Sequence, residues 1–210
     1  MIGVYTGRMA AKGMPGRPLY EKLVTTPVHG KCPLCGIGQV TTLDHHLPKS
    51  RYPILVVTPT NLVPSCTWCQ TSKKEAFPKT AEEETLHPYY DNLESSTWLK
   101  ATVVEGEPAS FIFDVDPPSE WPTTTVSRVR HHMAIFKLAR LYTSNAGSQL
   151  ASIRSRLTDL YNSCGIEGVK SYLSDDARSY GKVSFNSWQS AMYRAAASSN
   201  WFCSGGFRVG

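Results

Sequence analysis

The chain has 210 residues, an ordinary apolar content and a formal net charge of +5. This composition is typical of a soluble globular protein and excludes a largely disordered chain. No apolar run approaches the ~20 residues needed to cross a bilayer, and the N-terminus lacks the apolar core of a signal peptide. The mild positive charge permits a polyanionic partner without requiring one. We expect a cytoplasmic protein with one large domain, or a small module with an extension.

The first 30 residues carry no chemical motif. Residues 1–18 are basic and rich in glycine, so we expect a flexible N-terminal arm. Residues 19–30 predict a short helical turn, broken by Pro27 and Gly30. The rest of the chain is organised around residues 31–74, which begin immediately afterwards.

Two Cys-x-x-Cys pairs close this stretch, and pairs at such a separation are a strong signal for zinc. Four thiolates fill a tetrahedral zinc shell and leave no position open for substrate. Such a site is structural, so we expect the chemistry elsewhere. The spacing also favours a reducing compartment, where thiols hold metal instead of forming disulfides. The four expected zinc ligands are Cys32, Cys35, Cys66 and Cys69.

An acidic residue and a histidine lie between the two cysteine pairs. Residues 39–43 predict a short strand that delivers Asp44 and His45. Residues 53–57 are apolar and β-branched, and predict a partner strand or a loop packed on the core. The second cysteine pair opens a helix that carries Gln70. The expected order is strand, strand-like segment, helix.

The later part of the chain predicts a hairpin followed by helices. Residues 80–86 predict one helical turn, and residues 101–115 predict a β-hairpin. From residue 125 the apolar period becomes helical. The change near residue 120 is the candidate domain boundary.

Glycines divide this helical region in the sequence. Gly147, and then Gly165 with Gly168, predict breaks between helices, and Asn186 predicts the N-cap of the last one. The two cysteines outside the zinc motif are expected to be small buried apolar residues. They are Cys164 and Cys203.

Three strings, CPLCG, LDHHLPKSRYP and NLVPSCTWCQTSK, together resemble the HNH endonucleases, specifically bacterial members whose ββα-metal core is held by a four-cysteine zinc site. The match covers about residues 31–75. Looser similarity in HPYYD, NSWQ and WFC points to bacterial HNH proteins found near defence genes. The resemblance implies an α+β fold, with the zinc-bound nuclease module over residues 19–95 and a β-hairpin plus helices over residues 96–210.

The resemblance also implies roles for four residues. Asp44 matches the acidic ligand of a catalytic Mg²⁺ or Mn²⁺ ion, and His45 matches the general base. Asn61 matches the middle Asn, which holds the base in place. Gln70 lies where the family usually has Asn or His as a second metal ligand. Its carbonyl oxygen can bind a hard cation, but its side chain is one methylene longer, so the departure bears on metal affinity and activity.

The same residue types suit phosphodiester hydrolysis on chemical grounds. A neutral imidazole accepts a proton from water near pH 7, and a hydrogen bond to its second nitrogen fixes the tautomer. Carboxylate and amide oxygens suit a Mg²⁺-type ion, which stabilises the charge that develops on the phosphate. Four basic side chains are candidates for contacts to flanking phosphates. They are Lys49, Arg51, Lys73 and Lys74, and a solvated helix face is the alternative for the last two.

Several polar residues keep a structural interpretation. His46 faces away from His45 if the strand continues, so we expect it to be structural or to neighbour the substrate. His87 is expected to be a packed histidine or a support for the site. Asn61 also fits a simple turn. A solvated basic face is expected at the start of the first long helix, at Arg128, Arg130, His131 and His132.

Three functions follow as hypotheses. The first is a Mg²⁺-dependent HNH endonuclease that cleaves DNA as the effector of an anti-phage defence system, restrained by a protein partner such as an ATPase. The effector role and the partner are implied by the resemblance alone. The second is a zinc-ribbon binding module without catalysis, which the Gln70 departure favours. The third is an HNH nuclease directed against RNA, for example tRNA.

Overall fold

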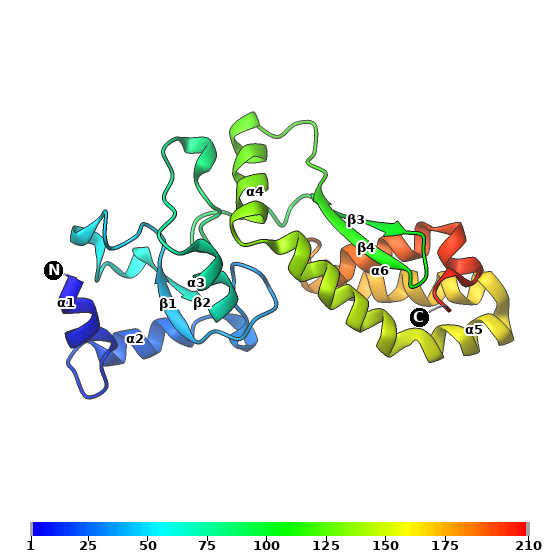
Figure 1. Ribbon diagram of the computed structural model, residues 1–210, viewed down its shortest axis with the longest axis horizontal. Helices are drawn as coiled ribbons and strands as arrows, with labels where there is room; N and C mark the ends of the chain where they lie inside the picture. Colours follow the sequence, from blue (N-terminus) through cyan, green and yellow to red (C-terminus); the bar gives the residue numbers. More distant parts are fainter. Residues whose placement is uncertain (1, 209–210) are drawn as a thin grey trace. The chain divides into compact units, whose positions relative to one another are not determined.

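A computed structural model describes residues 2–208, and the chain forms an α+β protein with two small antiparallel sheets (Figure 1). The chain divides into two compact units. The first contains the residues up to Asn92 together with Thr123–Phe136, and the second contains Leu93–Pro122 and the residues from Lys137 onward. The sequence pattern changes near residue 120, but the chain returns to the first unit there before it finally leaves at Phe136.

The first unit is built on the strands β1 (Thr42–His45) and β2 (Leu62–Ser65), followed directly by the helix α3 (Thr67–Lys73). The strands pair antiparallel, with His45 opposite Leu62. Of the two forms expected for residues 53–57, the packed loop is found: Pro53–Leu55 form a 3₁₀ turn, and Val56 packs in the core. The partner strand β2 is buried along its whole length, so it lacks the alternation of exposed and buried residues that marks a half-buried strand.

The N-terminal segment belongs to the core of the first unit. Where the sequence predicted a flexible arm, α1 (Ile2–Val4) leads into a helical turn at Tyr5–Ala10. Tyr5 and Met9, four residues apart on one face, are only 7% and 4% exposed. They pack in one cluster with Leu43, Val56 and Leu62, and α2 (Arg17–Val24) adds partly buried apolar residues beside it.

The helix α4 (Thr123–Ile135) is fixed to the first unit by buried polar contacts. Nδ1 of His132 accepts from the amide of Leu86 at 3.2 Å, and Nε2 lies 2.8 Å from the carbonyl oxygen of Leu34, to which it donates. Arg128 donates to both carboxylate oxygens of Asp91, at 2.9 and 2.6 Å. The expected solvated face is therefore wrong for Arg128 and His132, because hydrogen-bond partners on other segments draw both side chains inward.

Replacing His132 with glutamine should flatten the acid sensitivity of folding. Burial lowers the pKa of His132 from 6.5 to about 4, so between these pH values the unfolded chain binds more protons than the folded one. The stabilisation is therefore present above pH 6.5 and is lost as the pH falls towards 4, by at most about 3 kcal/mol. Urea denaturation from pH 4.5 to 7 measures the effect.

The neighbouring residue supplies the matched control for this experiment. His131→Gln makes the same substitution at the next position of α4 and leaves His132 in place. It should therefore keep the original dependence of the unfolding free energy on pH. An unchanged pH dependence of the unfolding free energy in His132→Gln would contradict the assignment of a neutral, buried His132.

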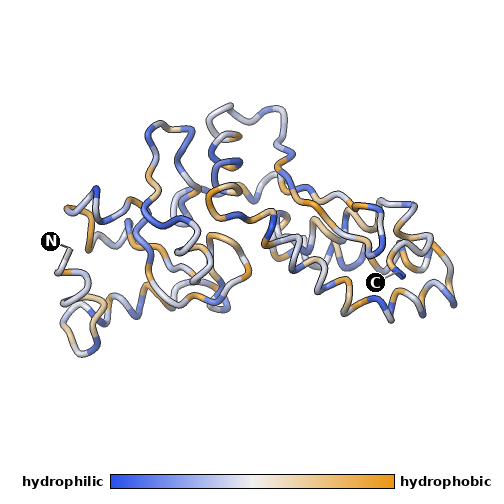
Figure 2. Tube along the Cα trace, viewed as in Figure 1, coloured by the Kyte–Doolittle hydropathy of each residue, from blue (hydrophilic) through white to orange (hydrophobic). Residues whose placement is uncertain are grey.

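The second unit pairs a hairpin with helices. The strands β3 (Leu99–Val104) and β4 (Ser110–Val115) form the predicted antiparallel hairpin, with Leu99 opposite Val115. The helices are α5 (Leu138–Val183) and α6 (Trp188–Ser198), followed by a helical turn at Phe202–Gly206. Apolar and polar residues alternate along α5 (Figure 2), and no helix among the described residues has the length and apolar content needed to cross a bilayer.

Two expected helix boundaries in this unit need correction. Gly147 lies inside α5, which continues through it, whereas the break falls at Gly165, where φ is +64°. Only the second position requires the left-handed conformation that glycine tolerates. The cap of α6 is Ser187, whose side chain accepts from the amide of Ser190. Asn186 instead accepts from the backbone of Trp98 and of the hairpin.

Candidate functional site

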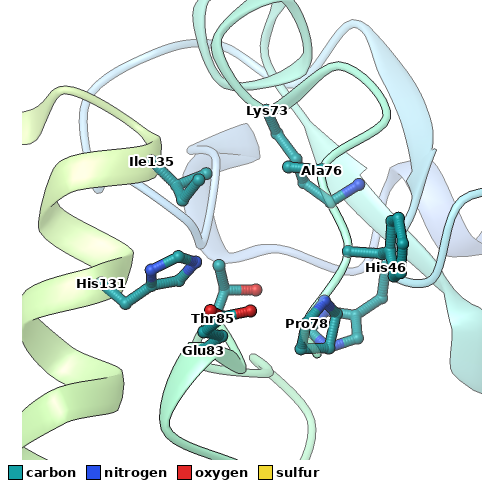
Figure 3. Close-up of a pocket in the computed structure, with 9 residues that line it drawn as sticks. His46, Lys73, Ala76, Pro78, Glu83, Thr85, His131 and Ile135 are labelled. Atoms are coloured by element: carbon teal, nitrogen blue, oxygen red, sulfur yellow. The ribbon is translucent and has the colours of Figure 1, made fainter. Parts of the chain in front are cut away.

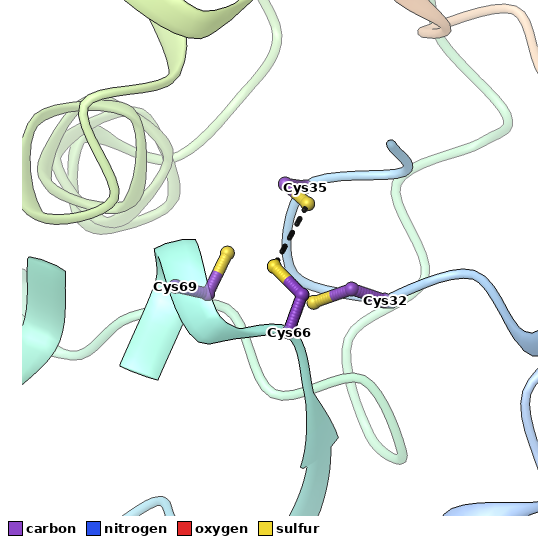
Figure 4. Close-up of side chains that lie close together, drawn as sticks. All are labelled: Cys32, Cys35, Cys66 and Cys69. Carbon is purple, nitrogen blue, oxygen red and sulfur yellow. Dashed lines mark hydrogen bonds between the residues drawn. The ribbon is translucent and has the colours of Figure 1, made fainter. Parts of the chain in front are cut away.

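The four motif cysteines converge in the first unit, from the loop before β1 and from the start of α3 (Figure 4). All four are buried, and their sulfur atoms lie within 4.8 Å of one another. The sulfurs of Cys35 and Cys66 are 3.8 Å apart. A tetrahedral Zn²⁺ with its usual bond lengths holds sulfurs about 3.8 Å apart. The donor set and its spacing therefore fit a structural zinc ion.

The backbone around the first pair is folded to hold thiolates. The amides of Cys35 and Gly36 donate to the carbonyl of Cys32, at 3.3 and 2.8 Å, which closes a tight knuckle. The amide of Gly38 donates to the sulfur of Cys35 at 3.4 Å. Cys66 precedes the first residue of α3, so the helix presents the second pair one turn apart. Hydrogen bonds of this kind orient the ligands of a metal site.

A methyl group at Gly38 should weaken the zinc site. A Cβ there would come within 2.6 Å of both the Cβ and the sulfur of Cys66, so the second ligand pair would have to move. Gly38→Ala should therefore lose zinc at least about 10-fold more readily, as expected when the supports of metal ligands are disturbed. Competition with a chromophoric chelator measures this. Gly147→Ala is the control, since a Cβ there meets nothing within 4 Å.

A cleft of about 280 Å³ opens in the same unit. It brings together three of the four residues with an implied catalytic role, from β1 and from α3. Two candidate phosphate contacts, Lys49 and Lys74, also line it. The lining residues are Tyr5, Thr42, Leu43, Asp44, His45, Pro48, Lys49, Gln70, Lys74 and Glu75.

His45 is held in one orientation. Its Nε2 lies 2.9 Å from the carbonyl oxygen of Val56. A carbonyl only accepts, so Nε2 carries the proton and Nδ1 is left as the basic nitrogen. The side chain is only 6% exposed, and this burial lowers the pKa of His45 below its ordinary value. A neutral imidazole with a defined basic nitrogen suits proton abstraction.

Asn61 fixes the loop from which that carbonyl comes. Its Oδ1 accepts from the amide of Leu47 at 2.8 Å, and its Nδ2 donates to the carbonyls of Leu47 and Leu55, at 3.1 and 3.2 Å. The side chain is buried and does not line the cleft. Asn61 thus fixes the backbone next to Val56, whose carbonyl accepts from His45, and it does more than form a turn.

Asp44 is paired with a buried ammonium group. Its Oδ2 lies 3.0 Å from Nζ of Lys73, whose side chain is only 4% exposed. The same Nζ donates to the carbonyl of His45 at 2.7 Å. The sequence placed Lys73 among the phosphate contacts, but its buried head group is turned inward between α3 and β1. The reason is the negative charge of Asp44, which attracts Lys73, the one cationic residue of α3.

The other candidate contacts differ in their surroundings. Gln70 and Lys74 are exposed on the cleft side of α3. Arg51 is exposed and places its guanidinium 4.9 Å from the ring centroid of Phe77. These side chains remain available to a ligand, whereas Lys73 does not.

Two other histidines considered in the sequence analysis, His46 and His87, do not line the cleft. The rings of His46 and His87 contact each other, with centroids 4.4 Å apart and planes tilted by 55°. Nε2 of His87 donates to the carbonyl of Thr60 at 2.9 Å and Nδ1 accepts from the amide of Tyr89, so both nitrogens are used. Burial, followed by the proximity of His87, lowers the pKa of His46 to about 3. His87 therefore supports the loop before β2 as a packed histidine.

A second cavity borders His46 and is just large enough for one water molecule, at about 10 Å³. Figure 3 shows His131 of α4 and His46 on opposite sides of it, with Lys73 above. Its size excludes a larger ligand, so it is a packing feature of the first unit.

Comparison with known proteins shows a similarity to a phage protein. No family model and no solved structure matches the chain. Over 154 residues the chain is 33% identical to the protein ea31 of Escherichia phage lambda, which covers 71% of this chain and 52% of that protein. The chain therefore spans about half the length of this relative, whose name states no activity and no ligand.

Proposed function

We propose that this protein is a metal-dependent HNH endonuclease that hydrolyses phosphodiester bonds of DNA, with His45 as the general base. The observation that carries the proposal is that Asp44, His45 and Gln70 line one cleft. The antiparallel pair β1 and β2, followed at once by α3, supports a ββα-metal core.

The chemistry assigned to the cleft follows from its atoms. Nδ1 of His45 takes a proton from water, and the resulting hydroxide oxygen bonds to phosphorus while the bond to the 3′ oxygen breaks and solvent protonates that oxygen. The carbonyl of Val56 stabilises the imidazolium through Nε2–H. Asp44 and Gln70 would hold a Mg²⁺ or Mn²⁺ ion, which when bound supplies positive charge to the phosphate oxygens. Lys49 and Lys74 face the flanking phosphates.

The charge distribution supports a polyanionic substrate at this unit. The first unit contains twelve Lys and Arg against seven Asp and Glu. The second unit contains ten of each. The net positive charge of the chain is therefore carried by the cleft-bearing unit, where counterion release would drive binding to nucleic acid.

The test is a cleavage assay with supercoiled plasmid and with structured RNA, offered to the same zinc-loaded preparation. We expect nicking of the plasmid with Mg²⁺ or Mn²⁺, none with EDTA, and recovery when Mg²⁺ is added back. Cleavage of RNA alone would redirect the proposal to an RNA nuclease. Failure to cut either substrate with any of these ions, by the chain alone or with the products of neighbouring genes, would overturn it.

One observation favours a second candidate, a zinc-ribbon binding module without catalysis. The ammonium of Lys73 already neutralises Asp44, and Gln70 departs from the usual metal ligand. Under this alternative the basic first unit binds nucleic acid with the usual salt dependence but does not cut it. Gel-shift and cleavage measurements on the same sample separate the two functions.

The role in anti-phage defence, and restraint by a partner such as an ATPase, extend the proposal and rest on the family resemblance. The second unit has equal numbers of acidic and basic residues, so it is the candidate region for a protein partner under this extension. Co-purification with the products of neighbouring genes, followed by the cleavage assay with and without ATP, tests this extension.

A further inference from the structure

The N-terminal segment, which the sequence left without a role, contributes a side chain to the cleft. Tyr5 lines it together with His45 and Lys49. The tyrosine is 7% exposed, although it lies near the start of the described chain. The burial of Tyr5 is not explained by the cysteine cluster, because Tyr5 is not one of its ligands.

The ring of Tyr5 touches the imidazole directly. The two centroids are 4.6 Å apart and the planes meet at 72°, an edge-to-face contact. Such contacts are favourable and directional. Nε2 of the same imidazole is bonded to the carbonyl of Val56. The imidazole of His45 is therefore held by a hydrogen bond and by an aromatic wall.

The phenol is itself anchored to the strand that carries His45. Its hydroxyl donates to the carbonyl of Leu43 at 3.2 Å, two residues before His45 on β1. Burial raises the pKa of Tyr5, so the hydroxyl remains protonated and continues to donate. The ammonium of Lys49 lies 5.8 Å from the centroid of the same ring, within the range of a cation–π contact.

We propose that Tyr5 is a positioning residue that holds the imidazole of His45 in its productive orientation, so that the N-terminal segment is a wall of the nuclease cleft. This inference rests on the proposed function of His45. The alternative is that Tyr5 only fills space in the core. Met9 tests this alternative, because it belongs to the same core cluster but does not line the cleft.

The experiment compares Tyr5→Ala, Tyr5→Phe and Met9→Ala in the full chain, under single-turnover conditions. Tyr5→Ala should lower the cleavage rate at saturating plasmid about 10- to 100-fold, the size expected when a catalytic group is misplaced by about 1 Å. Its KM should change by less than the rate. Tyr5→Phe keeps the ring and should recover most of the rate. Met9→Ala loses comparable core packing and should cleave at nearly the original rate wherever circular dichroism shows it folded.

A second readout does not depend on cleavage. Long-range ¹H–¹⁵N spectra of the histidine rings should show the single Nε2–H tautomer of His45 in the original chain, in Tyr5→Phe and in Met9→Ala, and mixed tautomers in Tyr5→Ala. Equal losses of rate in Tyr5→Ala and Met9→Ala, or an unchanged tautomer in Tyr5→Ala, would overturn the positioning role. Loss of the proposed function would appear differently, as cleavage that survives His45→Ala.

Discussion

His45→Ala is expected to abolish plasmid cleavage while leaving the zinc content unchanged. A positioned general base contributes about 10²- to 10⁴-fold to the rate, and within the cleft His45 is the imidazole whose basic nitrogen the backbone hydrogen bond leaves open. The zinc ligands come from other segments, so metal analysis should give the same stoichiometry. Single-turnover nicking at saturating Mg²⁺ measures the loss.

The variant must be separated from a merely unfolded protein. Removing a buried imidazole leaves a cavity beside Tyr5 and Val56, and the unfolding free energy should fall by about 1–3 kcal/mol. His131→Ala is the matched control, because it removes a histidine of the same unit that borders only the water-sized cavity. Cleavage that persists in a folded His45→Ala protein would remove the base assignment.

The four-cysteine cluster and three residues of the cleft were predictable because their signals are local. Two Cys-x-x-Cys pairs specify four ligands by spacing alone, and adjacent positions on one strand deliver Asp44 and His45 together. Gln70 follows Cys69 directly, so a helix that presents the zinc ligand also presents its neighbour. In each case a few consecutive residues are enough to predict the position of the side chain.

What sequence reasoning missed depends on contacts between distant segments. Tyr5 meets His45 across 40 positions of sequence, and the signal that identifies it, an apolar pair at helical spacing with Met9, is short and surrounded by glycine. Lys73 has the composition of a solvated helix end, and only the position of Asp44 on β1 draws it inward. His132 was assigned to a solvated face because no local pattern reveals its partner at Leu34.

The ion pair of Asp44 with Lys73 links the zinc-bearing helix to the chemistry of the cleft. A buried charge is costly unless it is paired, so Lys73 stabilises the carboxylate in the absence of a divalent ion. The pair also joins α3 to β1, because Nζ contacts both Asp44 and the carbonyl of His45. The position of β1 therefore depends on a helix whose own start carries Cys66 and Cys69.

This dependence leads to the prediction with the largest structural effect. Cys69→Ser should unfold the first unit and leave the second folded. Structural zinc sites contribute about 10–16 kcal/mol of apparent binding free energy to small domains, more than the usual stability of a domain. The second unit has its own core, which includes Phe111, Leu157 and Phe202. Hydrogen exchange should therefore show protection lost in β1, β2 and α3 but retained in α5 and α6.

Cys164→Ser is the control for this substitution, because Cys164 is exposed in the second unit and lies outside the cluster. It should keep one zinc ion per chain, full cleavage and the original exchange pattern. Cys69→Ser also distinguishes the structural metal from the catalytic one. Mg²⁺ added back after EDTA should restore cleavage only in a protein whose zinc site is intact. Retention of exchange protection throughout the first unit in zinc-free Cys69→Ser protein would show that the aromatic and ionic contacts around β1 suffice, and that the cysteine cluster does not hold the cleft together.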